Sequence, residues 1–157
     1  MKSNEKSQTR VKDWMSSHVV SIHADASVHE AIQAMQENRI SALPVVDKRN
    51  HCVGIVTTTD LVDIIYEVDD DVARTDPVDP ASRRRLVEHL TSTVGQEPIA
   101  TYMSEHVTTA LDSATLAAAA RLMVKDQVHH LPIVNTRDEL VGVLSSMDIL
   151  GQVADAD

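Results

Sequence analysis

The amino-acid sequence is an internal duplication. Residues 13–62 align without a gap to residues 101–150, so that each residue matches the one 88 positions later. Identical residues occur along the whole alignment, including Met15 and Met103, Pro44 and Pro132, Gly54 and Gly142, and Asp60 and Asp148. A register that is kept over this length indicates that the chain folds as two copies of one structural unit.

Each copy starts with the pattern of a short strand followed by a capped helix. The apolar runs 19–22 and 107–110 predict the strands. Ser27 and Glu30 have the spacing of a capping box, and apolar residues then recur every three or four positions, as on the buried face of a helix. Thr115 can cap the corresponding alanine-rich helix of the second copy.

The rest of each copy predicts a hairpin and a second helix. In the first copy the apolar runs 42–46 and 52–56 are separated by the turn-forming residues 47–50. A helix is predicted to start after Thr57 and to end near residue 66, and its counterpart starts after Ser145. The predicted fold class is therefore α/β (α+β), with two βαββα repeats.

A segment of different composition separates the copies. We assign residues 11–66 to the first repeat, 67–97 to an acidic linker and 98–153 to the second repeat. The acid run 69–71 predicts a solvated linker, within which residues 82–90 can form a short helix. Arg83-Arg84-Arg85 in that helix is either a patch for a phosphate or a partner, or a solvated face that neutralises the nearby acids.

Composition excludes several classes of protein. The chain has 24 acidic and 14 basic residues, a net charge of -10 and only 2% aromatic residues, which argues against nucleic-acid binding. Cys52 is the only cysteine, so the chain forms no intrachain disulfide, and we expect a cytoplasmic location. We predict neither an export signal nor a membrane-inserted segment, because no apolar stretch approaches about 18 residues.

The strongest candidate functional residues lie where each hairpin ends. Both copies have a glycine, two apolar residues, a hydroxyl residue and, three positions later, an aspartate: Thr57 and Asp60 in the first copy, Ser145 and Asp148 in the second. The first turn of a helix exposes unpaired N–H groups, which favour an anion or a sugar. The same spacing also describes a plain capping box, so both interpretations stay open.

Catalytic and metal-binding patterns are absent from the sequence. We find no nucleophile elbow, P-loop or GxGxxG motif, and we expect that the chain is not an enzyme and acts by binding. His129 and His130 are neighbours on a predicted strand, so their side chains point to opposite faces and no metal site is predicted. His130 remains a candidate neighbour of a phosphate.

These motifs together resemble the CBS domain in its tandem form, the Bateman module. The resemblance rests on the Leu-Pro strands that begin at Leu43 and Leu131, on the two hydroxyl-aspartate motifs and on the Met-Ser openings at Met15 and Met103. It covers residues 11–153 apart from the linker. It implies two repeats packed about a pseudo-twofold axis, with adenosine-containing ligands bound in clefts between them.

The resemblance also assigns roles to individual residues. Asp60 and Asp148 would hold ribose hydroxyls, Thr57 and Ser145 would contact ribose or phosphate, and adenine would lie against the first strands and the segments before the Leu-Pro pairs. The implied nucleotide-binding residues are Val20, Ser21, Ala42, Pro44, Thr57, Asp60, Thr108, Thr109, His130, Pro132, Ser145 and Asp148.

A regulatory function follows from this resemblance. It implies a sensor module, a homodimer without a required cofactor, that binds AMP, ADP, ATP or S-adenosylmethionine and regulates a separate protein. Many family members carry an arginine beside the motif aspartate, whereas Thr59, Leu61, Met147 and Ile149 stand there in this chain, which favours AMP. The alternative is a ligand-free module for protein interaction or dimerisation.

Overall fold

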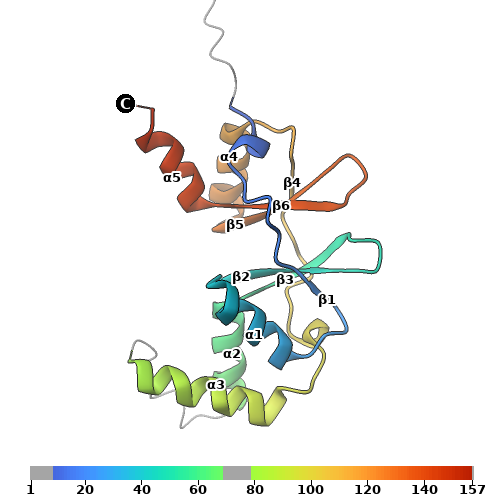
Figure 1. Ribbon diagram of the computed structural model, residues 1–157, viewed down its shortest axis with the longest axis vertical. Helices are drawn as coiled ribbons and strands as arrows, with labels where there is room; N and C mark the ends of the chain where they lie inside the picture. Colours follow the sequence, from blue (N-terminus) through green and yellow to red (C-terminus); the bar gives the residue numbers. More distant parts are fainter. Residues whose placement is uncertain (1–8, 69–78, 157) are drawn as a thin grey trace, which may run out of the picture. The chain divides into compact units, whose positions relative to one another are not determined.

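The chain folds into two compact units that do not coincide with the two sequence repeats. A computed structural model describes residues 9–68 and 79–156, so the acid run 69–71 lies outside the described residues (Figure 1). Val20–Lys48 and Val53–His106 form one unit, which we call the first-repeat unit. The residues up to Val19, Arg49–Cys52 and the residues from Val107 onward form the second-repeat unit.

The described residues of the first-repeat unit form a three-stranded sheet and three α-helices. The sheet has the order β1 (Ile22–His23), β2 (Ala42–Val46) and β3 (Cys52–Thr57), with β1 parallel to β2. Its helices are α1 (Val28–Asn38), α2 (Thr58–Val68) and α3 (Pro80–Val94), and a 3-10 turn follows at Ile99–Thr101.

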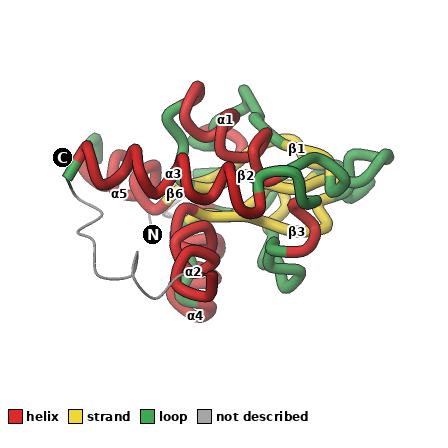
Figure 2. The backbone as a smooth tube through the Cα atoms, turned by 90° about the horizontal axis from the view of Figure 1, so that it is seen from below, coloured by secondary structure: helices red, strands yellow, loops and turns green. Residues whose placement is uncertain are grey.

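The second-repeat unit repeats this plan with two α-helices. Its sheet has the order β4 (Ala110–Leu111), β5 (His130–Val134) and β6 (Leu140–Ser145). β4 is parallel to β5, and β6 is antiparallel to β5. The helices are α4 (Leu116–Asp126) and α5 (Ser146–Ala154), both labelled in Figure 2. The 3-10 turn Val11–Asp13 belongs to the same unit.

The predicted order of elements, βαββα in each repeat, is confirmed, but the first strand of each repeat is shorter than predicted. Only Ile22 and His23 form a ladder with β2, through Val45 and Val46, and β4 pairs over two residues in the same way. The apolar residues just before β1 and β4 have the composition of strands, but they are not part of the parallel ladder with the central strand.

The opening segment of each repeat packs into the core of the other repeat's unit. Val11 is fully buried among the core residues of the second-repeat unit, and its N–H donates to the carbonyl of Ala114 at 2.9 Å. Ile99 is fully buried in the core of the first-repeat unit, and its N–H donates to the carbonyl of Ala26 at 2.7 Å. Each unit therefore needs a buried residue from the other sequence repeat.

Further along, each opening segment pairs with the last strand of the same unit. Ser16 forms an antiparallel bridge with Val143 of β6, and Ser104 forms the equivalent bridge with Ile55 of β3. Both bridges carry two backbone hydrogen bonds of 3.0 to 3.1 Å. The exchange of opening segments is thus the same in both units.

Helix α3 is longer and more buried than the sequence analysis predicted. It begins at Pro80, where the Asp79 carboxylate accepts from the N–H of Ser82 at 3.0 Å, and it continues to Val94. Leu90 and Val94 are buried in the core of the first-repeat unit, where α3 contacts both α1 and α2. The expectation of a solvated linker therefore does not hold for this segment.

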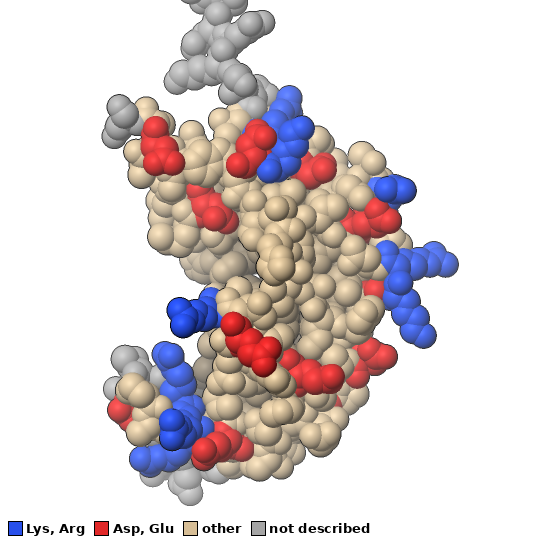
Figure 3. All heavy atoms as spheres, in the orientation of Figure 1, with Lys and Arg blue, Asp and Glu red and all other residues tan. Residues whose placement is uncertain are grey.

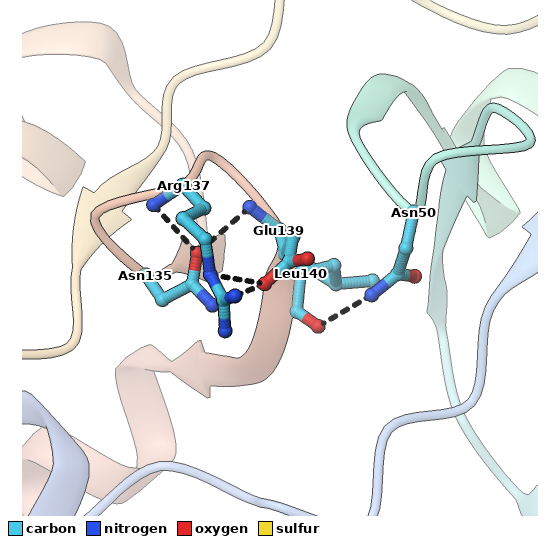
Figure 4. Close-up of polar contacts among 5 residues, drawn as sticks. All are labelled: Asn50, Asn135, Arg137, Glu139 and Leu140. Atoms are coloured by element: carbon cyan, nitrogen blue, oxygen red, sulfur yellow. Dashed lines mark hydrogen bonds and ion pairs between the residues drawn. The ribbon is translucent and has the colours of Figure 1, made fainter.

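A polar cluster fixes the hairpin turns of the second-repeat unit. The N–H of Leu140 donates to the carbonyl of Asn50 at 2.9 Å, and the Asn50 amide donates to the carbonyl of Leu140 at 3.0 Å (Figure 4). In the β5–β6 turn, the Asn135 side-chain oxygen accepts from the N–H groups of Arg137 and Glu139 at 2.9 and 3.0 Å. The two bonds with Leu140 tie Asn50 to β6 through both its backbone carbonyl and its side-chain amide.

Candidate functional site

Two helices start directly at the end of a strand, and each start carries the predicted hydroxyl and carboxylate. We call Thr57 and Asp60 the first capping pair, and Ser145 and Asp148 the second capping pair. In the first pair, the N–H and Oγ1 of Thr57 donate to Oδ2 of Asp60 at 2.7 and 2.9 Å. In the second pair, the N–H and Oγ of Ser145 donate to Oδ2 of Asp148 at the same two distances.

Both pairs are reciprocal capping boxes. The N–H of Asp60 donates to Oγ1 of Thr57 at 3.3 Å, and the N–H of Asp148 donates to Oγ of Ser145 at 3.2 Å. The capping role that the sequence left open is therefore real. It uses one carboxylate oxygen of each aspartate, and within the described part of the chain no hydrogen bond reaches either Oδ1.

Helix α1 offers an internal reference for these two boxes. Ser27 and Glu30 make the same set of bonds, at 2.7, 2.9 and 3.2 Å. Glu30 is exposed, whereas Asp60 and Asp148 are half-buried. Hydrogen bonds from the N–H and hydroxyl of Ser27 lower the pKa of Glu30. The local cap is thus the same at three helices, and only the two motif aspartates are partly enclosed by the fold.

The six residues predicted for the first site all belong to the first-repeat unit. Ala42 and Pro44 are buried in β2, Val20 is half-buried, and Ser21 is exposed. The N–H of Thr58, the first residue of α2, donates to the carbonyl of Ser41 at 3.0 Å. This bond joins the start of β2 to the helix that carries the first capping pair.

The second-repeat unit holds the other six predicted residues, and here the strand register is explicit. His130 is directly opposite Ser145 in the antiparallel pair, and Pro132 is opposite Val143. Residues that are opposite one another in such a pair project from the same face of the sheet. His130 and Ser145, the hydroxyl residue of the second capping pair, therefore project from the same face.

His130 is half-buried, and its pKa depends on that burial and on the charges of two neighbouring residues. Burial of the imidazole lowers the pKa of His130 most, the nearby His129 lowers it further, and Asp148 acts in the opposite direction. The net direction is below the usual value of 6.5. The imidazole is therefore neutral at pH 7.

One hydroxyl of the predicted second site already has a partner. Oγ1 of Thr108 donates to Oδ2 of Asp126, the last residue of α4, at 2.6 Å. The aligned positions in the first repeat hold Val20 and Asn38, so this bond has no equivalent there. Thr109, the other threonine predicted for this site, is half-buried.

The motif glycines serve a packing role that the sequence analysis did not identify. A Cβ atom at Gly54 would lie within contact distance of the side chain of Met103, and one at Gly142 would meet Met15 and the carbonyl of Ser16. Each glycine therefore admits the methionine of the opening segment in its own unit. The duplicated methionines and glycines were a signal for this contact, but they did not show which methionine meets which glycine.

Three other features bear on function: metal-binding side chains, membrane-spanning helices and the arginine run of α3. Among residues 9–68 and 79–156, no group of three or more His, Cys, Asp or Glu side chains could hold a metal ion. No helix in the described ranges is long and apolar enough to cross a bilayer. Arg83, Arg84 and Arg85 are exposed on α3, where Figure 3 shows basic side chains gathered.

A family model for the CBS domain matches residues 11–67 and 99–155, which together make up most of the chain. Both capping pairs and both Met-Ser openings lie inside these matched ranges. The chain belongs to the CBS domain family. It is a tandem CBS pair with an α/β fold, in which each repeat contributes a three-stranded mixed sheet and its helices.

Three relatives illustrate the range of this CBS family match. The uncharacterised protein MJ1426 of Methanocaldococcus jannaschii is 26% identical over 149 residues, which cover 89% of this chain and 88% of MJ1426. CBSX2, a protein of Arabidopsis thaliana, has been solved in complex with AMP; it is 22% identical, with a TM-score of 0.71 and coverage of 94% of this chain and 98% of CBSX2.

The third relative is the CBS domain pair of protein MJ0100, solved in complex with 5'-methylthioadenosine and S-adenosylmethionine. It is 23% identical, with a TM-score of 0.69 and coverage of 95% of this chain and 98% of that chain. These two structural likenesses establish the fold of the CBS pair.

Proposed function

We propose that this CBS pair is a regulatory module that binds an adenosine-containing ligand, with AMP favoured over ADP, ATP and S-adenosylmethionine. The observation that carries the proposal is the state of the two motif aspartates. Each is half-buried at the start of a helix, and each caps that helix with Oδ2 alone. The second carboxylate oxygen can accept a hydrogen bond from a ribose hydroxyl.

The relatives support the ligand class. CBSX2 has been solved with AMP, and the MJ0100 pair with 5'-methylthioadenosine and S-adenosylmethionine, so the common part of these ligands is adenosine. An adenosine would place its ribose at a capping pair and its base against the first strand and the start of the central strand. In the first-repeat unit these are Val20, Ser21, Ala42 and Pro44 with Thr57 and Asp60.

The preference for AMP follows from charge. The residues beside Asp60 are Thr59 and Leu61, and those beside Asp148 are Met147 and Ile149, so neither motif supplies a cation next to the carboxylate. A triphosphate carries more charge than the exposed N–H groups of one helix start can balance. A monophosphate carries less negative charge, so the site needs fewer positive groups to balance it.

Calorimetric titration of the full chain with AMP, ADP, ATP and S-adenosylmethionine tests this proposal. We expect AMP to bind most tightly, Asp60→Asn to remove binding at the first capping pair, and Asp148→Asn to remove binding at the second. Glu30→Gln is the matched control, because it changes an equivalent capping box on α1 whose carboxylate is exposed. The proposal fails if none of the four ligands binds, or if both aspartate variants bind AMP as the unaltered chain does.

Regulation would act through a change in a homodimer or in a separate partner protein. A ligand can shift such an equilibrium only by the difference in its affinity for the two states. Sedimentation of the chain with and without saturating AMP therefore measures whether occupancy changes its self-association.

A second function is favoured by a separate observation. Met147, Leu150 and Val153 of α5 are 70%, 58% and 59% exposed, and their spacing places them on one side of the helix. Such an apolar stripe suits a module that docks a protein without any ligand. This alternative predicts that the melting temperature stays unchanged with every nucleotide.

A further inference from the structure

The two proposed sites differ at one aligned position beside the capping pair. Ala42 begins β2 in the first-repeat unit, and His130 begins β5 in the second-repeat unit. The duplication aligns these two residues, and the backbone around them is equivalent, because the N–H of Thr58 donates to Ser41 as the N–H of Ser146 donates to His129. The change therefore places an imidazole where the other repeat has a methyl group.

The strand register brings this imidazole to the second capping pair. His130 is the direct partner of Ser145, and both project from the same face of the sheet. Ser145 in turn bonds Asp148 at 2.9 Å. A ligand whose ribose meets Asp148 at the start of α5 would thus have His130 within reach of its phosphate.

Two titratable groups act on the imidazole. Partial burial and the adjacent His129 favour the neutral form, while Asp148 of α5 favours the charged form. The neutral form prevails at pH 7 in the absence of a ligand. A bound phosphate adds negative charge beside the ring, which shifts the balance back toward the imidazolium.

We propose that His130 makes the second capping pair selective for a phosphorylated adenosine ligand and couples the binding of that ligand to the uptake of one proton. This inference rests on the proposed function, because it assumes that adenosine ligands occupy the capping pairs. The first capping pair, with Ala42, lacks the titratable group. Of the two sites, only the second then has an imidazole that couples ligand binding to pH.

The proposed proton uptake determines the direction in which ligand affinity changes with pH. When a phosphorylated ligand binds, neutral His130 takes up a proton, so affinity increases as the pH falls from 7.5 toward 6. Adenosine carries no phosphate and gives no such dependence. The phosphate of AMP has its own ionisation near pH 6, so the effect must be measured against a variant that lacks only the imidazole.

Calorimetry in two buffers of different ionisation enthalpy measures the proton uptake directly. The experiment uses the full chain with Asp60→Asn, so that only the second capping pair binds, and titrates AMP and adenosine at pH 7.5 and pH 6. The variants are His130→Ala, which matches Ala42 of the other repeat, and His130→Gln, which keeps a hydrogen-bond donor that does not titrate. His129→Ala removes the exposed imidazole just before β5 and is the control for the loss of a neighbouring histidine.

We expect proton uptake with AMP and none with adenosine in the parent chain, and the loss of that uptake in both His130 variants. At pH 6, His130→Ala should weaken AMP binding about tenfold, since hydrogen bonds to charged groups are among the stronger ones, and should change adenosine binding by less than about twofold. His129→Ala should retain the uptake.

Two results would overturn the inference, and they are distinguishable. If AMP binds and the His130 variants take up protons as the parent does, His130 is not the coupled group, while the proposed function stands. If neither AMP nor adenosine binds the parent at either pH, the proposed function itself fails, and the inference fails with it.

Discussion

The two units of this CBS pair are alike in their interior and different at their margins. In each, a residue of the other repeat's opening segment completes the core, a methionine sulfur lies on the motif glycine, and a hydroxyl-aspartate pair caps the helix after the hairpin. Duplication has therefore kept the contacts that hold a repeat together and has let its outer residues diverge.

Helix α3 shows how this divergence follows the packing. It covers the first-repeat unit, where Ile64 of α2 is buried. The aligned residue in α5 is Gln152, which is half-buried. In the described part of the second-repeat unit no helix takes the place of α3, and a polar residue stands at this position, as expected for a partly solvated site.

The largest effect should come from breaking the exchanged core contacts. Ile99→Ala removes a fully buried side chain and should lower the free energy of unfolding by about 2–5 kcal/mol. Hydrogen exchange should locate the loss in the first-repeat unit, although Ile99 belongs to the second sequence repeat. Val124→Ala, at a position that is 79% exposed, is the control and should change stability little. Faster exchange confined to the second-repeat unit would contradict the exchange of opening segments.

Substitution of the motif glycines should cause a smaller loss of stability, and the loss should differ between the two units. The atoms nearest to a Cβ at Gly54 all belong to the flexible side chain of Met103, whereas those nearest to a Cβ at Gly142 include the backbone carbonyl of Ser16 as well as Met15. We expect Gly54→Ala and Gly142→Ala both to destabilise the chain within the overpacking range of about 1–3 kcal/mol, with Gly142→Ala the worse of the two. Chemical denaturation measures the difference. Equal costs would mean that the Ser16 backbone moves as freely as a side chain.

Removing a capping hydroxyl should separate the structural role of a cap from its binding role. Ser145→Ala and Ser27→Ala each remove an N-cap and should each cost about 1 kcal/mol of stability. Only Ser145→Ala should also weaken AMP binding, as measured by titration calorimetry. If the two variants weaken AMP binding alike, the second capping pair has no special part in recognition.

The smallest effect should be a difference in pH dependence. Because the pKa of His130 lies below 6.5 in the folded chain, the unfolded chain binds more protons between that pKa and 6.5. The contribution of His130 to stability is therefore present above pH 6.5 and is lost as the pH falls through the folded pKa. In melting curves recorded from pH 7.5 to 5.5, His130→Ala should show a shallower decline than the parent. An identical decline would assign the pH dependence to other groups.

Much of the fold could be predicted from the sequence because the repeat register reports the order of elements twice. Capping residues predicted the helix starts after Ser27 and Thr115. The repeated hydroxyl-aspartate spacing identified the two motif aspartates. Helix α3 was underestimated because its three arginines suggest solvent exposure, although Leu86, Leu90 and Val94 recur every fourth residue, as a buried helical face requires.

The exchange of opening segments could not be predicted, and the reason is symmetry. Met15 and Met103 are identical, as are Gly54 and Gly142, so packing within a repeat and packing between repeats satisfy the same pattern. The capping pairs were also ambiguous, since a cap and a ligand site need the same residues. Only the half-buried position of Asp60 and Asp148, which depends on the tertiary structure, separates them from Glu30.

The exchange of opening segments also limits when each unit can complete its core during synthesis on the ribosome. The first-repeat unit lacks Ile99 until the segment after α3 has been made, so its core cannot be complete when the first repeat alone has been translated. Val11 is made long before Leu131 and Leu144, two of the residues that form the core around it. Val11 therefore stays outside a finished core until β6 has been made.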